Sequence, residues 1–431
     1  MDANIMPKDL FSEKLERFKV FIGDEWDWDW YECERSDDYK TLKLKLGRSA
    51  LLERVKVLLM KTEDLYLDDL KGVRSVLDEL DDQGFPELKH LHVQNSLGIQ
   101  YIIDWMIMDH PLLFRGLGKL EEVDVSSCEI MEEIVVEEGE DDEEINLTQT
   151  RSLRLDNLPQ LTSFCSQGQE KIGFPNLEDI KLSGINVKMI WPNQHIESHL
   201  YIEKLTTLIV DGCGNLNYLF TSSIVGSLAQ LKTLEICECK SMEEVIIAEG
   251  EGLEEEIVTK MLLHQLESLK LKDLPKLTRF CTSTLVECPA LKELCIQNCP
   301  QMTTFVSNYA TSNMASGSGL EIISPTLFDE KVAFPNLEQM QILNMDNLKM
   351  IWHNELHSDS FCKMKVLEVK YCEELLKIFP SMLLRDLQNL GDLVIWNCIS
   401  LKEAFDLQEL IKMKETVAIQ LRTLYIATSQ I

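Results

Sequence analysis

Several marks of common functional classes are missing from this sequence of 431 residues. No apolar run approaches the roughly 18 residues that a membrane helix needs, so we expect no membrane span. The first five residues form neither a basic segment nor an apolar core, so no secretory signal is expected. The 13 cysteines form no C-x-x-C pair, which favours reduced thiols in an intracellular protein, cytoplasmic with the nucleus as a second location.

Catalytic motifs are missing as well. The chain contains no G-x-S-x-G elbow, and no motif places a Cys/His or a Ser/His/Asp set. It also lacks a G-x-x-x-x-G-K-[ST] phosphate loop, since the nearest string, Gly116-Leu117-Gly118-Lys119, has the wrong spacing. The sequence therefore predicts no enzyme activity and no cofactor.

Basic charge is scarce: 42 Lys and Arg face 73 Asp and Glu, for a net charge of −31. Glu132 to Glu144 holds nine acidic residues and Glu243 to Glu256 holds seven, without any Lys or Arg. Such a surface repels phosphate backbones, so nucleic acid is not expected as a partner. The runs lack the D-x-D-x-D-G spacing of a calcium loop, which favours solvated loops, with contact to a basic partner as the alternative.

A repeat of the form L-x-x-L-x-L-x-x-C/N organises the chain, as in Leu205-x-x-Leu208-x-Val210-x-x-Cys213. With the second apolar position as anchor, fifteen units are found. The anchors are Phe18, Leu42, Leu65, Leu91, Val123, Leu153, Ile180, Leu208, Leu234, Leu269, Leu294, Met340, Leu367, Leu393 and Leu424. The alternation predicts a short strand with one buried face, and stacking of neighbouring strands buries leucines that a single unit cannot bury.

The predicted fold is an α/β repeat protein, a leucine-rich-repeat solenoid shaped as a curved horseshoe. It has a parallel β-sheet on the concave face, about 15 repeats and an irregular convex side. We expect one solenoid over residues 1–431, with acidic loop insertions near 132–146 and 243–258 and a long insertion near 306–333.

Longer blocks also recur. The string F-P-N-L-E at Phe174 to Glu178 returns at Phe334 to Glu338, and each copy leads to K-M-I-W. The L-P-x-L-T-x-F-C unit ending at Cys165 returns at Cys281. The array has therefore grown by duplication of blocks.

These strings, with the M-E-E units before the acidic runs, resemble the C-terminal repeats of plant coiled-coil nucleotide-binding leucine-rich-repeat disease-resistance proteins. The resemblance covers nearly the whole chain but no nucleotide-binding module. It implies a non-catalytic scaffold that recognises pathogen effectors or modified host proteins. It also implies restraint of the receptor's nucleotide-binding switch module, so that module and the recognised proteins are the expected partners.

Two other classes fit less well. A repeat-bearing substrate adaptor of a ubiquitin ligase also carries cysteine after the strand, but its repeats are more regular and follow an F-box. An extracellular receptor would show a signal peptide, paired cysteine caps and G-x-I-P repeats.

Possible metal ligands coincide with repeat positions. His195 and His199, like His353 and His357, have helical spacing but no third ligand, and we interpret them as polar turn residues. Cys237 and Cys239 should point to opposite faces of a strand. The sequence therefore predicts no metal site.

The residues beside each anchor should face the concave surface and could bind a partner. At one end they are basic, followed by tyrosine and histidine, and at the other end they are mainly aromatic. In order they are Arg17, Lys19, Lys43, Lys45, Tyr66, His90, His92, Tyr371, Val394, Trp396 and Tyr425. We expect the basic end to dock the switch module and the aromatic end to contact the ligand, because aromatic side chains are enriched in interface hot spots. Ordinary surface composition is the alternative for the basic end, and burial under a terminal cap for the aromatic end.

Overall fold

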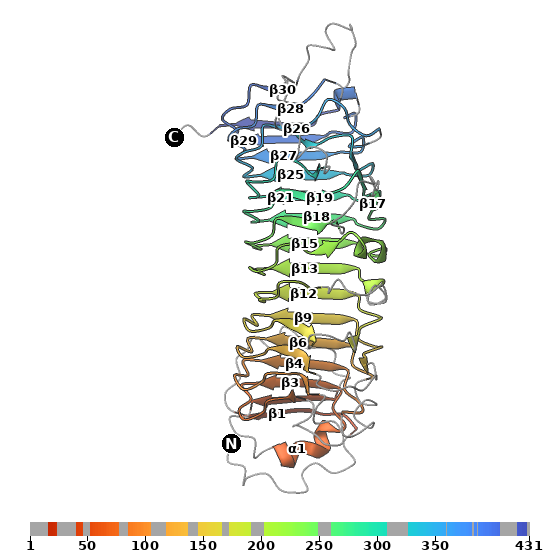
Figure 1. The fold of residues 1–431 in the computed structure, drawn as a ribbon, viewed down its shortest axis with the longest axis vertical. Helices are drawn as coiled ribbons and strands as arrows, with labels where there is room; N and C mark the ends of the chain where they lie inside the picture. The colour runs from red at the N-terminus through yellow and green to blue at the C-terminus, as the bar shows by residue number, and fades with distance from the viewer. Residues whose placement is uncertain are drawn as a thin grey trace, which may run out of the picture. The chain divides into compact units, whose positions relative to one another are not determined.

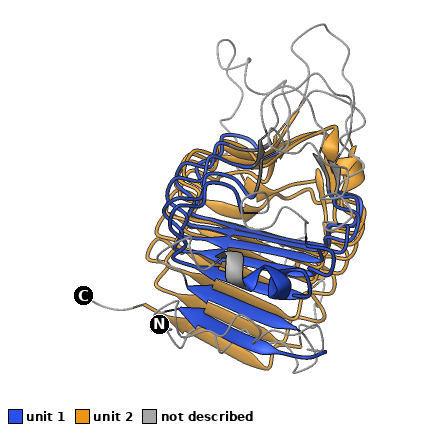
Figure 2. Ribbon diagram, turned by 90° about the horizontal axis from the view of Figure 1, so that it is seen from below, with its two compact units in different colours: residues 1–190, 195–205 blue, residues 191–194, 206–431 orange. Residues whose placement is uncertain are grey.

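The computed structural model describes fourteen segments of the chain. They are residues 16–23, 40–45, 52–76, 85–104, 118–136, 145–165, 172–190, 202–248, 260–307, 326–358, 360–381, 383–385, 387–405 and 420–428. The chain divides into two units, one formed by residues 1–190 with 195–205 and the other by residues 191–194 with 206–431 (Figure 2). We call them unit 1 and unit 2.

Each unit is built on a ladder of five-residue parallel strands, in chain order (Figure 1). In unit 1 the ladder consists of β1 (Lys19–Gly23), β2 (Thr41–Lys45), β3 (Asp64–Asp68), β4 (His90–Gln94), β6 (Glu122–Ser126), β9 (Ser152–Asp156) and β12 (Asp179–Ser183). In unit 2 it consists of β13 (Thr207–Asp211), β15 (Thr233–Cys237), β18 (Ser268–Lys272), β21 (Glu293–Gln297), β25 (Gln339–Leu343), β27 (Val366–Lys370), β29 (Asp392–Trp396) and β31 (Thr423–Ala427).

Strand alternation explains why the ladders form. In the ladder strands between β1 and β31, the second and fourth residues are buried apolar side chains, as Leu208 and Val210 are in β13. The first, third and fifth residues point away from the core, and we call the surface that they form the outer face. Each strand pairs in register with the next, so that like positions meet, as Leu208 meets Leu234. The predicted leucine-rich-repeat solenoid with a parallel sheet is confirmed.

The residue after most ladder strands has a left-handed backbone. Gly184 and Gly212 take φ values of 58° and 62°, and ten non-glycine residues take values from 50° to 55°. These are Asp69, Asn95, Ser127, Asn157, Glu238, Asp273, Asn298, Asn344, Tyr371 and Asn397. Gly, Asn and Asp tolerate this conformation best, which explains why they prevail there. The turn directs the next residue back into the core.

That next residue is commonly cysteine, and it does more than fill space. The thiol of Cys213 donates to the carbonyl of Asp211 at 3.5 Å, and that of Cys372 to Lys370 at 3.4 Å. In the repeat of β4, Ser96 occupies this place, and its hydroxyl donates to the carbonyl of Gln94 at 2.9 Å. In these repeats the small side chain satisfies a backbone carbonyl inside the core, whereas a buried aliphatic residue such as Leu158 or Leu274 fills the same place in others.

Shorter parallel strands cover the sides away from the ladder. In unit 1 they are β5 (Ile103–Asp104), β7 (Glu133–Val136) and β10 (Ser163–Cys165), and the pair β8 (Ile145–Asn146) and β11 (Ile172–Gly173). In unit 2 one sheet joins β14 (Phe220–Thr221), β16 (Glu244–Ile247), β19 (Arg279–Thr282) and β22 (Val306–Ser307), and a second joins β17 (Lys260–Leu262), β20 (Leu285–Glu287) and β24 (Val332–Ala333). A third joins β23 (Thr326–Phe328), β26 (Met350–Trp352), β28 (Lys377–Phe379) and β30 (Glu403–Phe405).

Helix is sparse in the described residues. Its elements include α1 (Leu52–Leu59) and the 3-10 turns η6 (Ile224–Ser227) and η8 (Leu383–Arg385). No helix among the described residues has the length and apolarity needed to cross a membrane.

Two sequence expectations need comment here. The first anchor was wrong, because Val20 and not Phe18 aligns with Leu42, which moves that repeat by two residues. The parts of the predicted insertions at residues 137–144, 249–259 and 308–325 lie outside the described residues. A single solenoid over residues 1–431 stays a prediction.

Candidate partner-binding face

The basic end of the predicted surface is less open than the sequence suggested. Arg17 and Lys19 are exposed, but Arg17 precedes β1, and Phe21 takes the outer position beside Lys43. Lys43 is only 2% exposed, and its Nζ lies 5.1 Å from the centre of the Phe21 ring. Lys45 forms an ion pair with Asp68 at 3.3 Å. Lys43 therefore lies at an outer position of β2 but adds little exposed positive charge there.

The cause is stacking between side chains of neighbouring strands. Directly opposed positions in a sheet lie close enough for their side chains to touch. The ammonium of Lys43 lies 4.5 Å from the centre of the Tyr66 ring, a cation–π contact. Tyr66 in turn stacks on His92, with ring centres 4.2 Å apart and planes 7° from parallel. All three side chains are buried or nearly so, and they form a rigid column rather than a mobile surface.

His92 lies between two carboxylates. Its Nε2 is 3.5 Å from Oδ1 of Asp64, and its Nδ1 is 3.8 Å from Oδ2 of Asp124. His90 is 1% exposed, and its Nδ1 is 3.7 Å from the same Asp64 oxygen. Burial alone would lower the pKa of His92, but Asp124 and Asp64 outweigh it and hold that pKa above its usual value. Tyr66, His90 and His92 are thus outer-face residues that are largely withdrawn from solvent.

The middle of the unit 2 outer face is polar and internally neutralised. Lys270 and Lys272 lie 3.2 and 3.7 Å from the carboxylate of Glu235. Desolvation would raise the pKa of Glu235, but the hydrogen bond and charge of Lys270 hold it below its usual value. Cys237 and Cys239 point to opposite sides, as predicted, with only Cys239 fully buried. Charges that cancel across strands leave little net field for a partner.

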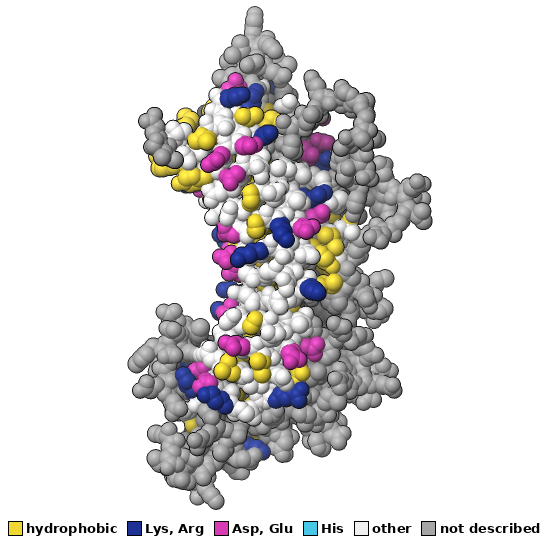
Figure 3. Space-filling view, turned by 60° about the vertical axis from the view of Figure 1, so that its left-hand side comes forward, with side chains coloured by type: hydrophobic (Ala, Val, Ile, Leu, Met, Phe, Trp, Pro, Cys, Tyr) yellow, Lys and Arg dark blue, Asp and Glu magenta, His cyan; other side chains and the backbone are white. Residues whose placement is uncertain are grey.

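The aromatic end is more open than the basic end, although Trp396 is half-buried. Trp396 and Tyr425 occupy outer positions of β29 and β31, and their rings stack with centres 5.4 Å apart. Tyr425 is 43% exposed, and Val394 beside it is half-buried. Hydrophobic side chains gather over the part of unit 2 that carries these strands (Figure 3). We call Tyr371, Val394, Trp396 and Tyr425 the aromatic cluster.

Tyr371 differs in origin from the other members. It is not a strand residue but the left-handed turn residue after β27, with φ of 55°. Its N–H donates to the carbonyl of Trp396 at 2.8 Å, which fixes it beside the cluster, and its side chain is 45% exposed. A bulky aromatic residue is poorly suited to this backbone region.

The apolar surface continues onto both faces of β31. Leu424 and Ile426 occupy inward positions but are 51% and 52% exposed. Within the described part of the chain, β31 pairs with β29 and with no second strand.

Sequence reasoning missed the carboxylates around His92. Asp64, Glu122 and Asp124 sit at outer positions of β3 and β6, and His92 is opposite Asp124 in register. The sequence did contain a signal for them. When an H-x-H strand pairs in register with a following E-x-D strand, each imidazole lies beside a carboxylate. Of the predicted histidine pairs, His195 and His199 lie outside the described residues. His353 Nδ1 accepts from the N–H of Glu355 at 3.1 Å, a turn contact.

Comparison with known proteins agrees with this architecture. The family described as plant disease resistance protein RPS2-like, leucine-rich repeats, matches residues 61–184, 176–324 and 336–428. A probable disease resistance protein of Arabidopsis thaliana is 29% identical over 130 residues, which are 30% of this chain. The match spans only 14% of that relative's length.

Two solved structures are similar. A complex of TLR13 with ssRNA13 shares 17% identity, covering 82% of this chain and 57% of that chain, with a TM-score of 0.21. A leucine-rich-repeat protein of Leptospira interrogans shares 13% identity, covering 88% of this chain and 99% of that chain, also with a TM-score of 0.21.

The family match extends over most of the chain and includes the ladder strands from β3 to β31. The leucine-rich repeats form a recognition scaffold of the kind used in plant defence. The sequence predicts no catalytic set of residues in it. The chain belongs to the RPS2-like leucine-rich-repeat family of plant disease resistance proteins.

Proposed function

We propose that this chain is the sensing region of an intracellular plant immune receptor. It binds a pathogen effector or a modified host protein, and it restrains the receptor's switch module until that protein arrives. The observation that carries the proposal is the aromatic cluster of unit 2, in which Tyr371 and Tyr425 are exposed and Trp396 stacks on Tyr425. Large aromatic side chains held in place lose little conformational entropy on binding and supply most of the energy at protein interfaces.

The backbone of Tyr371 supports the same assignment. Most other repeats place Asn, Asp or Gly at the left-handed turn, whereas Tyr371 accepts a backbone conformation that costs about 1 kcal/mol. Strain of this kind is commonly retained at functional sites, and the Tyr371 side chain is 45% exposed. Selection for binding is a sufficient reason to keep it.

The experiment compares Trp396→Ala and Tyr425→Ala, each placed in the complete receptor, with Leu97→Ala. Leu97 is a 53% exposed apolar residue of unit 1 and serves as the control. We expect the two aromatic variants to weaken the pathogen-triggered cell-death response in leaves by at least tenfold in effector dose. All three proteins should accumulate equally and unfold within about 1 kcal/mol of wild type. An undiminished response in both aromatic variants refutes the proposed ligand face.

Restraint of the switch module is assigned to the exposed basic residues before and in β1. Because Lys43 is buried, the charge reversals belong at Arg17 and Lys19. We expect Arg17→Glu with Lys19→Glu to reduce co-purification of the nucleotide-binding module and to raise cell death in the absence of pathogen. Unchanged co-purification contradicts this half of the proposal and leaves the aromatic cluster unaffected.

A further inference from the structure

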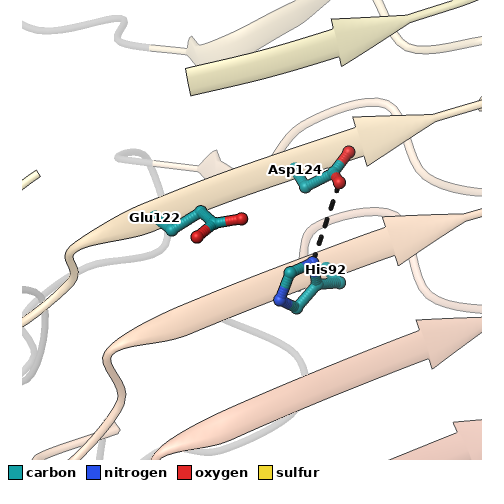
Figure 4. Close-up of side chains that lie close together, drawn as sticks. All are labelled: His92, Glu122 and Asp124. Carbon is teal, nitrogen blue, oxygen red and sulfur yellow. Dashed lines mark ion pairs between the residues drawn. The ribbon is translucent and has the colours of Figure 1, made fainter. Parts of the chain in front are cut away.

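Three potential metal ligands converge on the outer face of unit 1. His92 comes from β4, and Glu122 and Asp124 come from β6 (Figure 4). Because the two strands pair in register, His92 is opposite Asp124, and Glu122 lies one outer position earlier. One ligand atom from each residue lies within 4.8 Å of the other two. Figure 4 shows the imidazole and both carboxylates turned toward the same space.

We propose that His92, Glu122 and Asp124 bind a divalent transition-metal ion of the Zn²⁺ class. One imidazole nitrogen and two carboxylate oxygens form a ligand set that zinc accepts, and three protein ligands leave a fourth position for water or for a group of a partner. The site is independent of the proposed receptor function, since it depends only on the geometry of β4 and β6.

The spacing suits a shared ion better than a direct hydrogen bond. The 3.8 Å between Nδ1 of His92 and Oδ2 of Asp124 exceeds the usual 2.7–3.2 Å of a hydrogen bond. Two ligands about 2.1 Å from a tetrahedral zinc ion lie about 3.4 Å from each other. A small rotation of the Asp124 and Glu122 side chains would therefore bring all three atoms into the coordination sphere.

The surroundings of His92 match those of a metal-bound histidine. A ligating imidazole usually donates its second ring N–H to a carboxylate, which fixes its tautomer. Here Nε2 of His92 lies 3.5 Å from Oδ1 of Asp64, and both atoms are buried without a hydrogen-bond partner among the described residues. With Nδ1 on the metal, Nε2 carries the proton and faces Asp64. The hydroxyl of Thr41 donates to the other Asp64 oxygen at 3.3 Å.

Two further contacts fix the orientation of the ligands. Tyr66 stacks on the imidazole of His92 and holds its plane. Arg154 Nε lies 4.0 Å from Oδ1 of Asp124, so the second oxygen of that carboxylate has a cationic neighbour. Ligands oriented in advance lose less conformational freedom when the ion binds.

Charge and access also favour a cation. Asp64, Glu122 and Asp124 place three carboxylates around one imidazole, and a doubly charged ion offsets more of their repulsion than a single proton does. His92 is 9% exposed, whereas Glu122 and Asp124 are half-buried, which provides a path for entry from solvent. A second group, Glu330, His353 and Glu355, is more exposed, and a ring nitrogen of its histidine is already used by a backbone N–H.

The experiment titrates ZnCl₂ into the purified, EDTA-stripped full chain by calorimetry, and then CoCl₂ with detection of visible absorption. Wild type is compared with His92→Gln, Glu122→Gln, Asp124→Asn and Asp64→Asn. The matched control is Glu293→Gln, which removes a carboxylate from the same first ladder position in unit 2. Glu122 and Asp124 are half-buried, so their variants should keep the fold even where His92→Gln does not.

We expect wild type and Glu293→Gln to bind one Zn²⁺ at micromolar concentration. Glu122→Gln and Asp124→Asn should bind at least tenfold more weakly, and Asp64→Asn, which acts through His92, about tenfold more weakly with the stoichiometry unchanged. Absence of saturable binding in wild type refutes the site and leaves His92 as a protonated bridge between carboxylates. Equal binding in wild type, Glu122→Gln and Asp124→Asn also refutes it, since the ion would then be held elsewhere.

Discussion

The outer faces of the two units use the same ladder geometry to opposite effect. In unit 1 the third strand positions hold Phe21, Lys43, Tyr66 and His92, which stack into a column that is largely buried from Lys43 onward. In unit 2 the equivalent positions hold paired charges in the middle and Val394 and Tyr425 at the end, which stay half-buried or exposed. The backbone register therefore decides which residues meet, and the residue types decide whether the face is a fixed structure or a contact surface.

The largest expected difference between the units concerns their buried thiols. Burial raises the pKa of the Cys128 thiol to about 11 in unit 1 and that of Cys299 to about 12 in unit 2. A pKa raised above its unfolded value contributes stability that is fully present below the unfolded pKa, here 9.0, and is lost as pH rises toward the folded pKa. At pH 10.5 each such thiol should therefore lower the free energy of unfolding by about 2 kcal/mol, relative to a pH below 9.0.

Seven of the eight described cysteines whose pKa is raised lie in unit 2, so its alkaline loss should be the greater. Urea unfolding under reducing conditions at pH 8 and pH 10.5 measures this loss. Cys299→Ala should lose about 2 kcal/mol less than wild type between the two pH values. If the free energy of unfolding fell equally in wild type and Cys299→Ala between the two pH values, burial would not raise the pKa of Cys299 in this way.

A second test exchanges charge at matched lysines. Lys43 and Lys270 both occupy the third position of a ladder strand, but Lys43 is 2% exposed whereas the Lys270 side chain is 36% exposed. Lys43→Glu sets a buried carboxylate against two aromatic faces and should lower the free energy of unfolding by about 3 kcal/mol. Lys270→Glu replaces an attraction to Glu235 with repulsion at a wet surface and should lower it by less than about 1 kcal/mol.

Urea unfolding of the two variants measures this difference, and 1 M NaCl should reduce only the Lys270→Glu effect, because salt screens exposed charges. If the two variants lost equal free energy of unfolding, Lys43 would not lie in a more buried environment than the solvent-exposed Lys270.

The smallest expected effect is a gain. Tyr371→Asn replaces a bulky residue at a left-handed turn with the residue type that most other repeats use there, and should raise the free energy of unfolding by about 0.5–1 kcal/mol. The reciprocal change, Asn344→Tyr after β25, should lower it by a similar amount. Thermal unfolding measures both. A loss of stability in Tyr371→Asn would show that the Tyr371 ring contributes to packing.

Much of the fold follows from the sequence, because period-two burial, with cysteine after the turn in several repeats, fixes the strand positions. Fourteen anchors lie at the second position of a ladder strand, as Leu42 and Leu208 do. The exception, Phe18, arose because Phe18, Val20 and Ile22 alternate without a following cysteine, so anchors at Phe18 and at Val20 fit equally well.

The state of the outer face was harder to predict than the register. A repeat formula treats every x position alike, yet the burial of Lys43 depends on Phe21 and Tyr66 from two other repeats. Those neighbours are 22 and 23 residues away in sequence and become adjacent only when the ladder strands pair in register. The aromatic cluster could be proposed from the sequence because Trp396 and Tyr425 are aromatic at positions where most other repeats are polar.

In-register pairing has a consequence for how such a chain changes over generations. Each ladder strand contacts only the strand before and the strand after it, and all present the same apolar positions to the core. Unequal recombination that adds or removes whole repeats therefore leaves every junction compatible. The same event moves every outer-face residue after the junction along the ladder by whole strands, relative to the residues before the junction. New combinations of surface side chains can thus arise by copy-number change alone, without any substitution that the core would have to tolerate.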